Sequence, residues 1–212
     1  MSTNPSTRSV KIADDERGGW SSDRPRRDGA PPRPPDLTVR CRILAPSDRL
    51  RYTPGSLVLI VSPSAEAREA FVDRVLEDRS ALFSLAKVRG LLAGRVPDGE
   101  IEAKAHELLA AAVQKRLDAG DSVVIIADGL GADEREPHLR AAAKLRRPRH
   151  VILLDTGREG IADEDLEALN ELRRRLDAGE LGEEGVQTAL RLGGPTIAEA
   201  KRLVFRPPPK DD

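Results

Sequence analysis

The stretch from Ser56 to Val72 constrains the fold of this chain more than any other. It begins with the continuous apolar run Leu57–Val61, passes through the small residues Ser62-Pro63-Ser64, and continues with apolar residues at helical spacing. A short, β-branched-rich run that is apolar at every position is typical of a strand covered on both faces, as in parallel sheets. The sequence therefore predicts a buried strand, a tight turn and an amphipathic helix, with Ser64 as the helix N-cap.

Two further apolar runs of the same kind follow, and helical stripes precede each of them. The clearest stripe is Glu100–Ala119, which leads to the run Ser122–Asp128. A second stripe, Arg135–Leu145, leads to the run Val151–Asp155. This alternation of buried strands and helices predicts an α/β fold, a parallel sheet with helices on both faces, in the three-layer α/β/α arrangement of P-loop proteins.

Shorter patterns predict the remaining elements. We expect strands where apolar residues alternate or cluster, and helices where leucines recur at helical spacing. The predicted strands are Leu37–Leu44, Leu82–Leu85 and Leu203–Phe205, and the predicted helices are Asp163–Ala178, Glu180–Leu192 and Thr196–Lys201, the last with a capping-box pattern.

Composition divides the chain into three parts. Residues 1–36 are rich in Ser, Arg, Asp, Gly and Pro, so they offer too little apolar surface to offset the entropy of ordering, and we expect a disordered arm. Residues 37–205 form the expected domain. Residues 206–212 contain three consecutive prolines and form an expected disordered tail.

The charge and residue content narrow the possible functions. The net charge is −1, so no global field attracts nucleic acid or anionic membranes, and aromatic residues, at 2%, are too few for base stacking. One cysteine and three scattered histidines offer neither a disulfide framework nor a metal cluster. With no apolar run near the length of a membrane span and no apolar signal region, we expect a cytoplasmic protein without membrane contact.

The strand-turn-helix layout at Ser56–Val72 is that of a phosphate-binding loop, whose signature is G-x-x-x-x-G-K-[ST]. The four defining positions here are Ser62, Ala67, Arg68 and Glu69, and none of them matches. A Cβ stands where two glycines would allow close approach to phosphate, and Arg is a longer, planar cation than Lys. A carboxylate on the first helical turn takes the place that attracts phosphate. We therefore expect this cofactor position to be non-functional.

Three later segments carry a resemblance that begins at Ser56 and extends to Leu203. They are Phe83–Arg89, Ala105–Gly120 and Val123–Gly129, and their order and spacing are similar to motifs of the polynucleotide 5′-kinase-like branch of the P-loop kinases. That branch includes the kinase domain of bacterial RNA-repair kinase-phosphatases. The resemblance implies a kinase-like fold in which the individual motifs are degenerate.

The resemblance also assigns roles to particular positions. The position of the general base falls on Ala86, which cannot accept a proton, whereas the arginine that contacts the acceptor phosphate is retained as Arg89. The lid that would contact the transferring phosphoryl group falls on Thr156–Ala162 and offers Arg158. Asp128, at the carboxyl end of its strand, is the candidate base or metal ligand if the chain is active.

These observations favour a catalytically inactive, kinase-like protein that binds or scaffolds an unknown protein partner, without a cofactor or a metal. Two alternatives remain open. One is a divergent kinase that uses ATP and Mg²⁺ on a nucleic-acid 5′ end or a small molecule, with Arg68 and Asp128 in place of the lost groups. The other is a nucleic-acid-binding protein that uses the basic run 140–149, which includes Arg140, Lys144 and Arg147. The oligomeric state is open.

Overall fold

The computed structural model describes residues 37–157 and 161–207 of the chain. The expected arm at 1–36, most of the expected tail at 206–212, and Arg158 lie outside these residues. Among the described residues, no helix is both long and apolar enough to cross a membrane.

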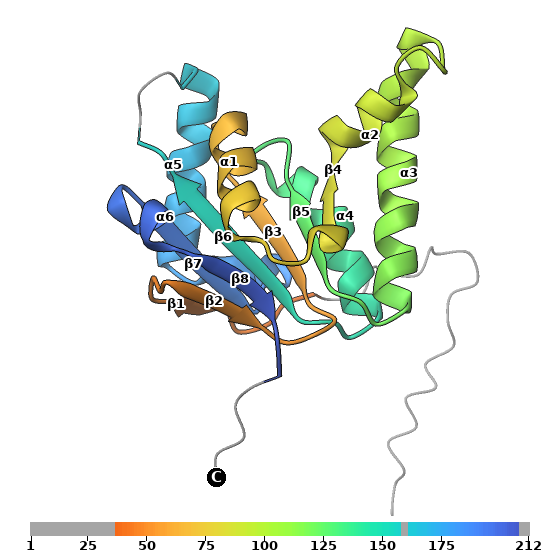
Figure 1. The fold of residues 1–212 in the computed structure, drawn as a ribbon. Coiled ribbons are helices and arrows are strands. Elements are labelled where there is room, and N and C mark those ends of the chain that lie inside the picture. The colour runs from red at the N-terminus through yellow and green to blue at the C-terminus, as the bar shows by residue number, and fades with distance from the viewer. Residues whose placement is uncertain (1–36, 158–160, 208–212) are drawn as a thin grey trace, which may run out of the picture. The chain divides into compact units, whose positions relative to one another are not determined.

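Six parallel strands form the main sheet, in the order β1-β7-β6-β3-β5-β4 (Figure 1). The central strand β3 (Leu57–Val61) is buried at all five positions and pairs with strands on both sides, as its continuous apolar run predicts. The other strands are β1 (Arg42–Leu44), β7 (Thr188–Gly193), β6 (Arg149–Asp155), β5 (Val123–Ile126) and β4 (Leu82–Ser84).

One face of the sheet is covered by three helices. These are α3 (Asp98–Asp118), α4 (Ala132–Lys144) and α5 (Asp163–Asp177). Their buried stripes pack on the strand residues that point to this face, and the leucines of the stripes are Leu109, Leu117, Leu139, Leu169, Leu172 and Leu176. The short helix α2 (Leu85–Leu92) packs against α3.

The opposite face is covered by a helix and by a second small sheet. Helix α1 (Ala65–Val75) packs there through Phe71 and Val72, beside a two-stranded parallel sheet of β2 (Arg49–Tyr52) and β8 (Arg202–Phe205). The short elements η1 (Arg79–Ala81), η2 (Glu180–Glu184) and α6 (Pro195–Glu199) complete the domain. The predicted α/β fold, a parallel sheet with helices on both faces, is thus confirmed.

The predicted helix Glu180–Leu192 is wrong. The segment is a short turn of 3₁₀ helix that ends at Gly185, whose φ of 92° a continuing helix cannot accommodate, followed by strand β7. The apolar residues Leu181 and Val186 are compatible with helical spacing, but β7 is buried at Ala189, Leu190 and Leu192 because it extends the sheet beyond β6.

Three smaller expectations also need correction. Strand β8 pairs with β2 and not with the main sheet, and β2 itself was not predicted because its alternation spans only four residues. Only Arg42–Leu44 of the predicted strand Leu37–Leu44 is a strand. Thr196 does not cap its helix; its hydroxyl bonds to the backbone of Gly193, and Gly194 occupies the N-cap position of α6.

Candidate functional site

Most of the site residues predicted from the sequence lie at the carboxyl ends of β3, β5 and β6. Open α/β sheets place their ligands at this edge. The three strands are neighbours, so the residues that follow them, Ser62, Asp128 and Thr156, lie along one edge of the sheet. Figure 1 shows this edge at the arrowheads of the strands, where α1 begins.

The connection between β3 and α1 is short. Helix α1 begins at Ala65, so only Ser62, Pro63 and Ser64 separate the strand from the helix. The predicted N-cap is confirmed, because the Ser64 hydroxyl accepts a hydrogen bond from the backbone N–H of Ala67 at 3.1 Å. The N–H of Arg68 donates to the Ser64 carbonyl oxygen at 3.2 Å. The backbone N–H groups of Ala67 and Arg68 are therefore already used within the helix.

The Arg68 side chain turns back under this connection and is 5% exposed. Its Nη1 donates to the carbonyl oxygen of Ser62, and its Nη2 donates to the carbonyl oxygen of Asp128 at 3.3 Å. The Nε group is buried without a hydrogen-bond partner. Burial lowers the pKa of Arg68, and the nearby carboxylates of Asp128 and Glu69 oppose that shift without reversing it. A cation of the protein itself thus occupies the space between the ends of β3 and β5.

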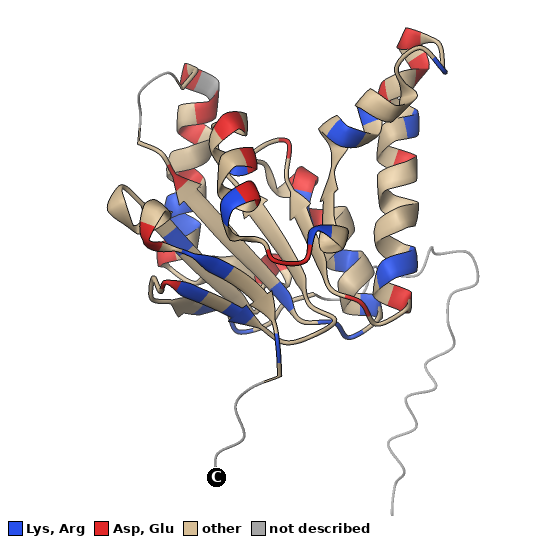
Figure 2. Ribbon diagram, viewed as in Figure 1, with Lys and Arg blue, Asp and Glu red and all other residues tan. Residues whose placement is uncertain are grey.

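The surface around Arg68 is acidic. Glu66 and Glu69 are exposed on the first two turns of α1, and Asp163 and Asp165 are exposed at the start of α5. Figure 2 shows acidic residues at the beginning of both helices. Asp165 is close enough to Arg68 to act on its pKa. These carboxylates place negative charge at the starts of both helices, where a phosphate site would carry positive charge.

Arg89, the position retained from the kinase motif, is held by two carboxylates of the chain. Its Nε and Nη2 form a bidentate pair with Glu102 on α3, at 2.7 and 2.6 Å. Its Nη1 donates to Asp128 Oδ2 at 2.6 Å. These hydrogen bonds, the Glu102 bond first, raise the pKa of Arg89 and keep it charged. The structure therefore brings Arg68, Arg89 and Asp128 together, with Asp128 between the two arginines.

Asp155, at the end of β6, also holds arginines from other elements. Its carboxylate is 7% exposed and accepts hydrogen bonds from Arg173 on α5 (Nε, 2.9 Å) and from Arg191 on β7 (Nη2, 2.7 Å). Burial alone would raise the pKa of Asp155, but the bonds from Arg173 and Arg191 outweigh it and lower the pKa. Arg191 also pairs with Asp177 at 3.1 Å, so two further arginines at the carboxyl edge are balanced by two carboxylates of the fold.

A cavity of about 370 Å³ lies beside Asp128, between α3 and α4. Apolar residues such as Leu109 and Ile125 line it together with His106 and His138. Burial lowers the pKa of His138 to about 4, so this imidazole is neutral at pH 7. Neither histidine stands out in the sequence, because they lie 32 residues apart on separate helices.

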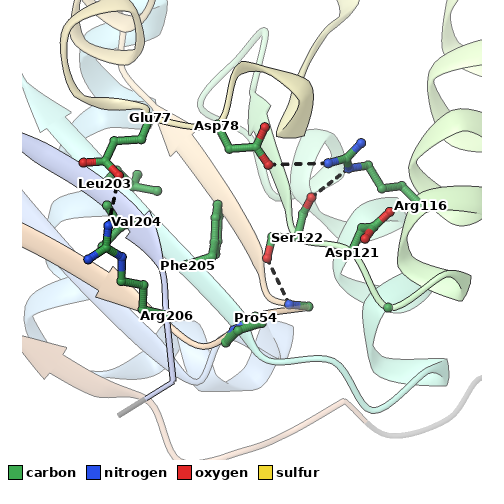
Figure 3. Close-up of a pocket in the computed structure, with 12 residues that line it drawn as sticks. Pro54, Glu77, Asp78, Arg116, Asp121, Ser122, Leu203, Val204, Phe205 and Arg206 are labelled. Carbon is green, nitrogen blue, oxygen red and sulfur yellow. Dashed lines mark hydrogen bonds and ion pairs between the residues drawn. The ribbon is translucent and has the colours of Figure 1, made fainter. Parts of the chain in front are cut away.

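A second cavity, of about 280 Å³, lies at the opposite, amino-terminal edge of the sheet (Figure 3). Four of its charged groups are paired: Arg116 lies 3.7 Å from Asp78 and Arg206 lies 3.6 Å from Glu77. The Ser122 hydroxyl accepts a hydrogen bond from Gly55 N–H at 2.9 Å, which joins the start of β5 to the turn before β3. The contacts at this edge therefore join neighbouring elements of the fold.

The basic run 140–149 does not form a continuous cationic surface. Arg149 is buried and donates to the Gly185 carbonyl, and Arg147 donates to the Leu117 carbonyl. Arg140 pairs with Glu136 one helical turn away. Lys144 and Arg146 alone of these five cations are exposed.

The remaining predicted positions contribute no reactive group. Ala86 is exposed on the first turn of α2, behind the N-cap Ser84. Within the described residues there is no group of three or more histidine, cysteine or carboxylate side chains that could hold a metal ion.

Comparisons with known proteins leave the family open. No protein-family model matches this chain, and no curated protein matches it. One similar solved structure is that of a "putative kinase" from Chloroflexus aurantiacus J-10-fl, at 15% identity, with 69% of this chain and 88% of that chain covered and a TM-score of 0.42. Another is a tunicamycin resistance protein of Deinococcus radiodurans, at 14% identity, with 68% and 91% covered and a TM-score of 0.39. Similarity at this level carries no functional argument.

Proposed function

We propose that this chain is a non-catalytic protein built on a P-loop kinase-like fold, of the polynucleotide 5′-kinase-like branch, and that it works as a binding or scaffold module for another protein. The observation that carries the proposal is the position of Arg68. Its guanidinium lies between the ends of β3 and β5 and donates to the Ser62 and Asp128 carbonyls, where an active kinase of this class would hold nucleotide phosphates.

The loss of the phosphate site rests on two further features. The three-residue connection leaves the N–H groups of Ala67 and Arg68 bonded to Ser64, so they are not available to a ligand. Glu66 and Glu69 place negative charge at the helix start, where a phosphate would need positive charge. A nucleotide would have to unwind the first turn of α1 and displace a buried cation before it could bind.

We infer the loss of phosphoryl transfer from the positions that correspond to the acceptor-phosphate arginine and the general base. Arg89 is neutralised by Glu102 and Asp128, and Ala86 offers no proton acceptor. Phosphoryl transfer depends on positioned cations, a metal and a base acting together, and the removal of one oriented donor already costs 10²–10³-fold in comparable active sites. With several of these groups absent or occupied, we propose no nucleotide cofactor and no kinase activity.

The ion pairs at the carboxyl edge then have a structural purpose. Asp128 and Asp155 each hold arginines from two different elements, and so they fasten α2, α5 and β7 to the sheet. Such a rigid framework suits a binding module, which needs a fixed surface and no moving lid.

A transfer assay tests this proposal. The full chain is incubated with γ-labelled ATP, Mg²⁺ and a 5′-hydroxyl oligonucleotide, and labelled product is measured against a reaction without protein. We expect no transfer above that background. The comparison variant S62G/A67G/R68K/E69T restores the four signature positions, and we expect it to lack transfer as well, because Ala86 is unchanged. Transfer by the natural chain would overturn the proposal.

A further inference from the structure

The outward face of the β2–β8 sheet carries unpaired positive charge, in contrast to the carboxyl edge of the main sheet. Arg49 and Arg51 are exposed on β2, whereas Leu50 and Tyr52 between them are buried against the core. Figure 2 shows the basic residues on these strands. Arg51 makes no ion pair among the described residues, and Arg49 has only Asp48, at 3.9 Å. These two arginines lie on one face, about 7 Å apart.

The other end of this small sheet is neutralised. Arg202 on β8, the register partner of Arg49, lies 3.3 Å from Glu77, and Arg206 lies 3.6 Å from the same carboxylate. Figure 3 shows Glu77 and Arg206 together at the rim of the amino-edge cavity. The available positive charge is therefore concentrated on β2.

Strand β2 also has a free edge. It pairs only with β8 within the described residues. The carbonyl oxygens of Asp48 and Tyr52 accept hydrogen bonds from Arg202 and Arg206, on the β8 side. Because alternate residues of a parallel strand bond to a given neighbour, the backbone groups of Arg49 and Arg51 point to the opposite edge.

The two residues at that edge differ in their backbone bonds. The N–H of Arg49 donates to the Ser47 hydroxyl at 3.2 Å, and the C=O of Arg49 accepts a hydrogen bond from the same hydroxyl at 3.3 Å. The N–H and C=O of Arg51 have no hydrogen-bond partner among the described residues. An unpaired backbone donor and acceptor on an exposed edge are the groups that an added strand uses.

We propose that the free edge of β2 binds an extended acidic peptide of a partner protein, which adds as a third strand to the β2–β8 sheet. Backbone hydrogen bonds join the peptide to Arg51, and carboxylates at alternate peptide positions meet the guanidinium groups of Arg49 and Arg51. Arginine suits this contact because its planar fork pairs with a carboxylate through two parallel hydrogen bonds.

The size and charge of this surface favour a peptide over other polyanions. The strand is four residues long, which matches a short peptide and not a nucleic-acid duplex, and a longer polyanion would extend over a molecule whose net charge is −1. Tyr52 is buried beneath the arginines, so no aromatic platform for base stacking stands beside them. The proposal is independent of the proposed loss of catalysis, because none of its residues lies at the carboxyl edge of the main sheet.

Two substitutions at position 51 distinguish the contribution of the side-chain charge from that of the backbone hydrogen bond. Arg51→Gln removes the charge and keeps the backbone donor. Arg51→Pro removes the donor as well, and proline is tolerated in an edge strand where its nitrogen points away from the neighbouring strand. The double variant R49Q/R51Q removes both charges. The matched control R95Q/K144Q removes two exposed cations elsewhere that make no ion pair among the described residues.

The test is fluorescence anisotropy with a labelled peptide of alternating Glu and Val, at low and physiological salt. We expect saturable binding that weakens with salt, at least tenfold weaker for R49Q/R51Q, weaker again for R51P than for R51Q, and within twofold of the natural chain for R95Q/K144Q. Circular dichroism establishes that each variant is folded.

Four outcomes would overturn the proposal. These are no peptide binding at low salt, equal binding by R49Q/R51Q, equal binding by R51P and R51Q, and stronger binding of a DNA duplex or of anionic phospholipid vesicles than of the peptide. The first two reject the arginines as the contact, the third rejects strand addition, and the last assigns the surface to a different class of partner.

Discussion

The Arg68 guanidinium donates to the Asp128 carbonyl oxygen at 3.3 Å and so joins the first turn of α1 to the end of β5. In a phosphate-binding loop this space belongs to the ligand. Here the side chain of Arg68 fills it.

If Arg68 stabilises the fold by filling the space between β3 and β5, the stability should depend more on the size of its side chain than on its charge. We expect Arg68→Met to change the free energy of unfolding by less than about 1 kcal/mol, because an apolar side chain of similar size avoids the cost of burying a cation with an unpaired Nε. We expect Arg68→Ala to cost about 2 kcal/mol or more, because it leaves a cavity. Urea unfolding measures both. A larger loss for Met than for Ala would contradict this role.

The buried carboxylate of Asp155 should be among the most sensitive positions in the domain. Asp155→Asn leaves the half-buried Arg173 without its counter-charge and leaves Arg191 with Asp177 alone, and we expect a loss of about 3 kcal/mol. Its matched control is Glu171→Gln, which removes an exposed pair with Arg174 and should leave the free energy of unfolding nearly unchanged. Chemical denaturation of both variants at pH 7 compares them, and similar losses would show that Asp155 does not fasten the edge.

His150 makes the fold sensitive to acid. Burial, followed by the charges of Arg149 and Arg42, lowers its pKa from 6.5 to about 4. Between these values the unfolded chain binds a proton that the folded chain does not, so stability is present above pH 6.5 and falls as the pH drops toward 4. The loss from this group is about 3 kcal/mol.

The effect is measured as the free energy of unfolding between pH 4 and pH 7. We expect a shallower pH dependence for His150→Asn, with a residual slope from His138, whose pKa is lowered in the same way. An identical slope in natural and H150N protein would contradict the assignment.

Gly182 allows the segment before β1 to approach η2. A Cβ at this position would lie 2.1 Å from the Val39 carbonyl oxygen, and Val39 N–H donates to the Gly182 carbonyl at 2.9 Å. Gly182→Ala must therefore displace the backbone, and we expect a loss of about 2 kcal/mol or more, comparable to other overpacked sites. Gly99→Ala is the control, since nothing lies within 4 Å of a Cβ there. Thermal melting compares the two variants.

The sequence was sufficient for elements whose burial shows in consecutive residues. The apolar runs of β3, β5 and β6 indicated strands covered on both faces, and Ser64 indicated the start of α1, because these signals are local. β7 was predicted as helix because six residues with a mixed pattern do not reveal that they will lie beside β6.

The candidate site could be predicted from the sequence only in part. Positions in a motif identified Ser62, Arg68, Arg89 and Asp128, but they did not predict where the arginine side chains point. The Arg89–Asp128 pair joins residues 39 apart, and Arg89–Glu102 depends on how α2 packs on α3. Sequence patterns carry no record of such long-range pairing, so the neutralisation of the arginines emerges only in the folded structure.

The central claim is that no nucleotide binds at the end of β3, and thermal melting with and without millimolar Mg-ATP tests it most directly. A nucleotide present at 100 times its Kd would add about 2.7 kcal/mol of stability, which raises the Tm of a domain of this size by roughly 5–10 °C. We predict a shift of less than about 1 °C for the natural chain. A rise of several degrees that is lost when Arg68 is replaced by Met would contradict the claim.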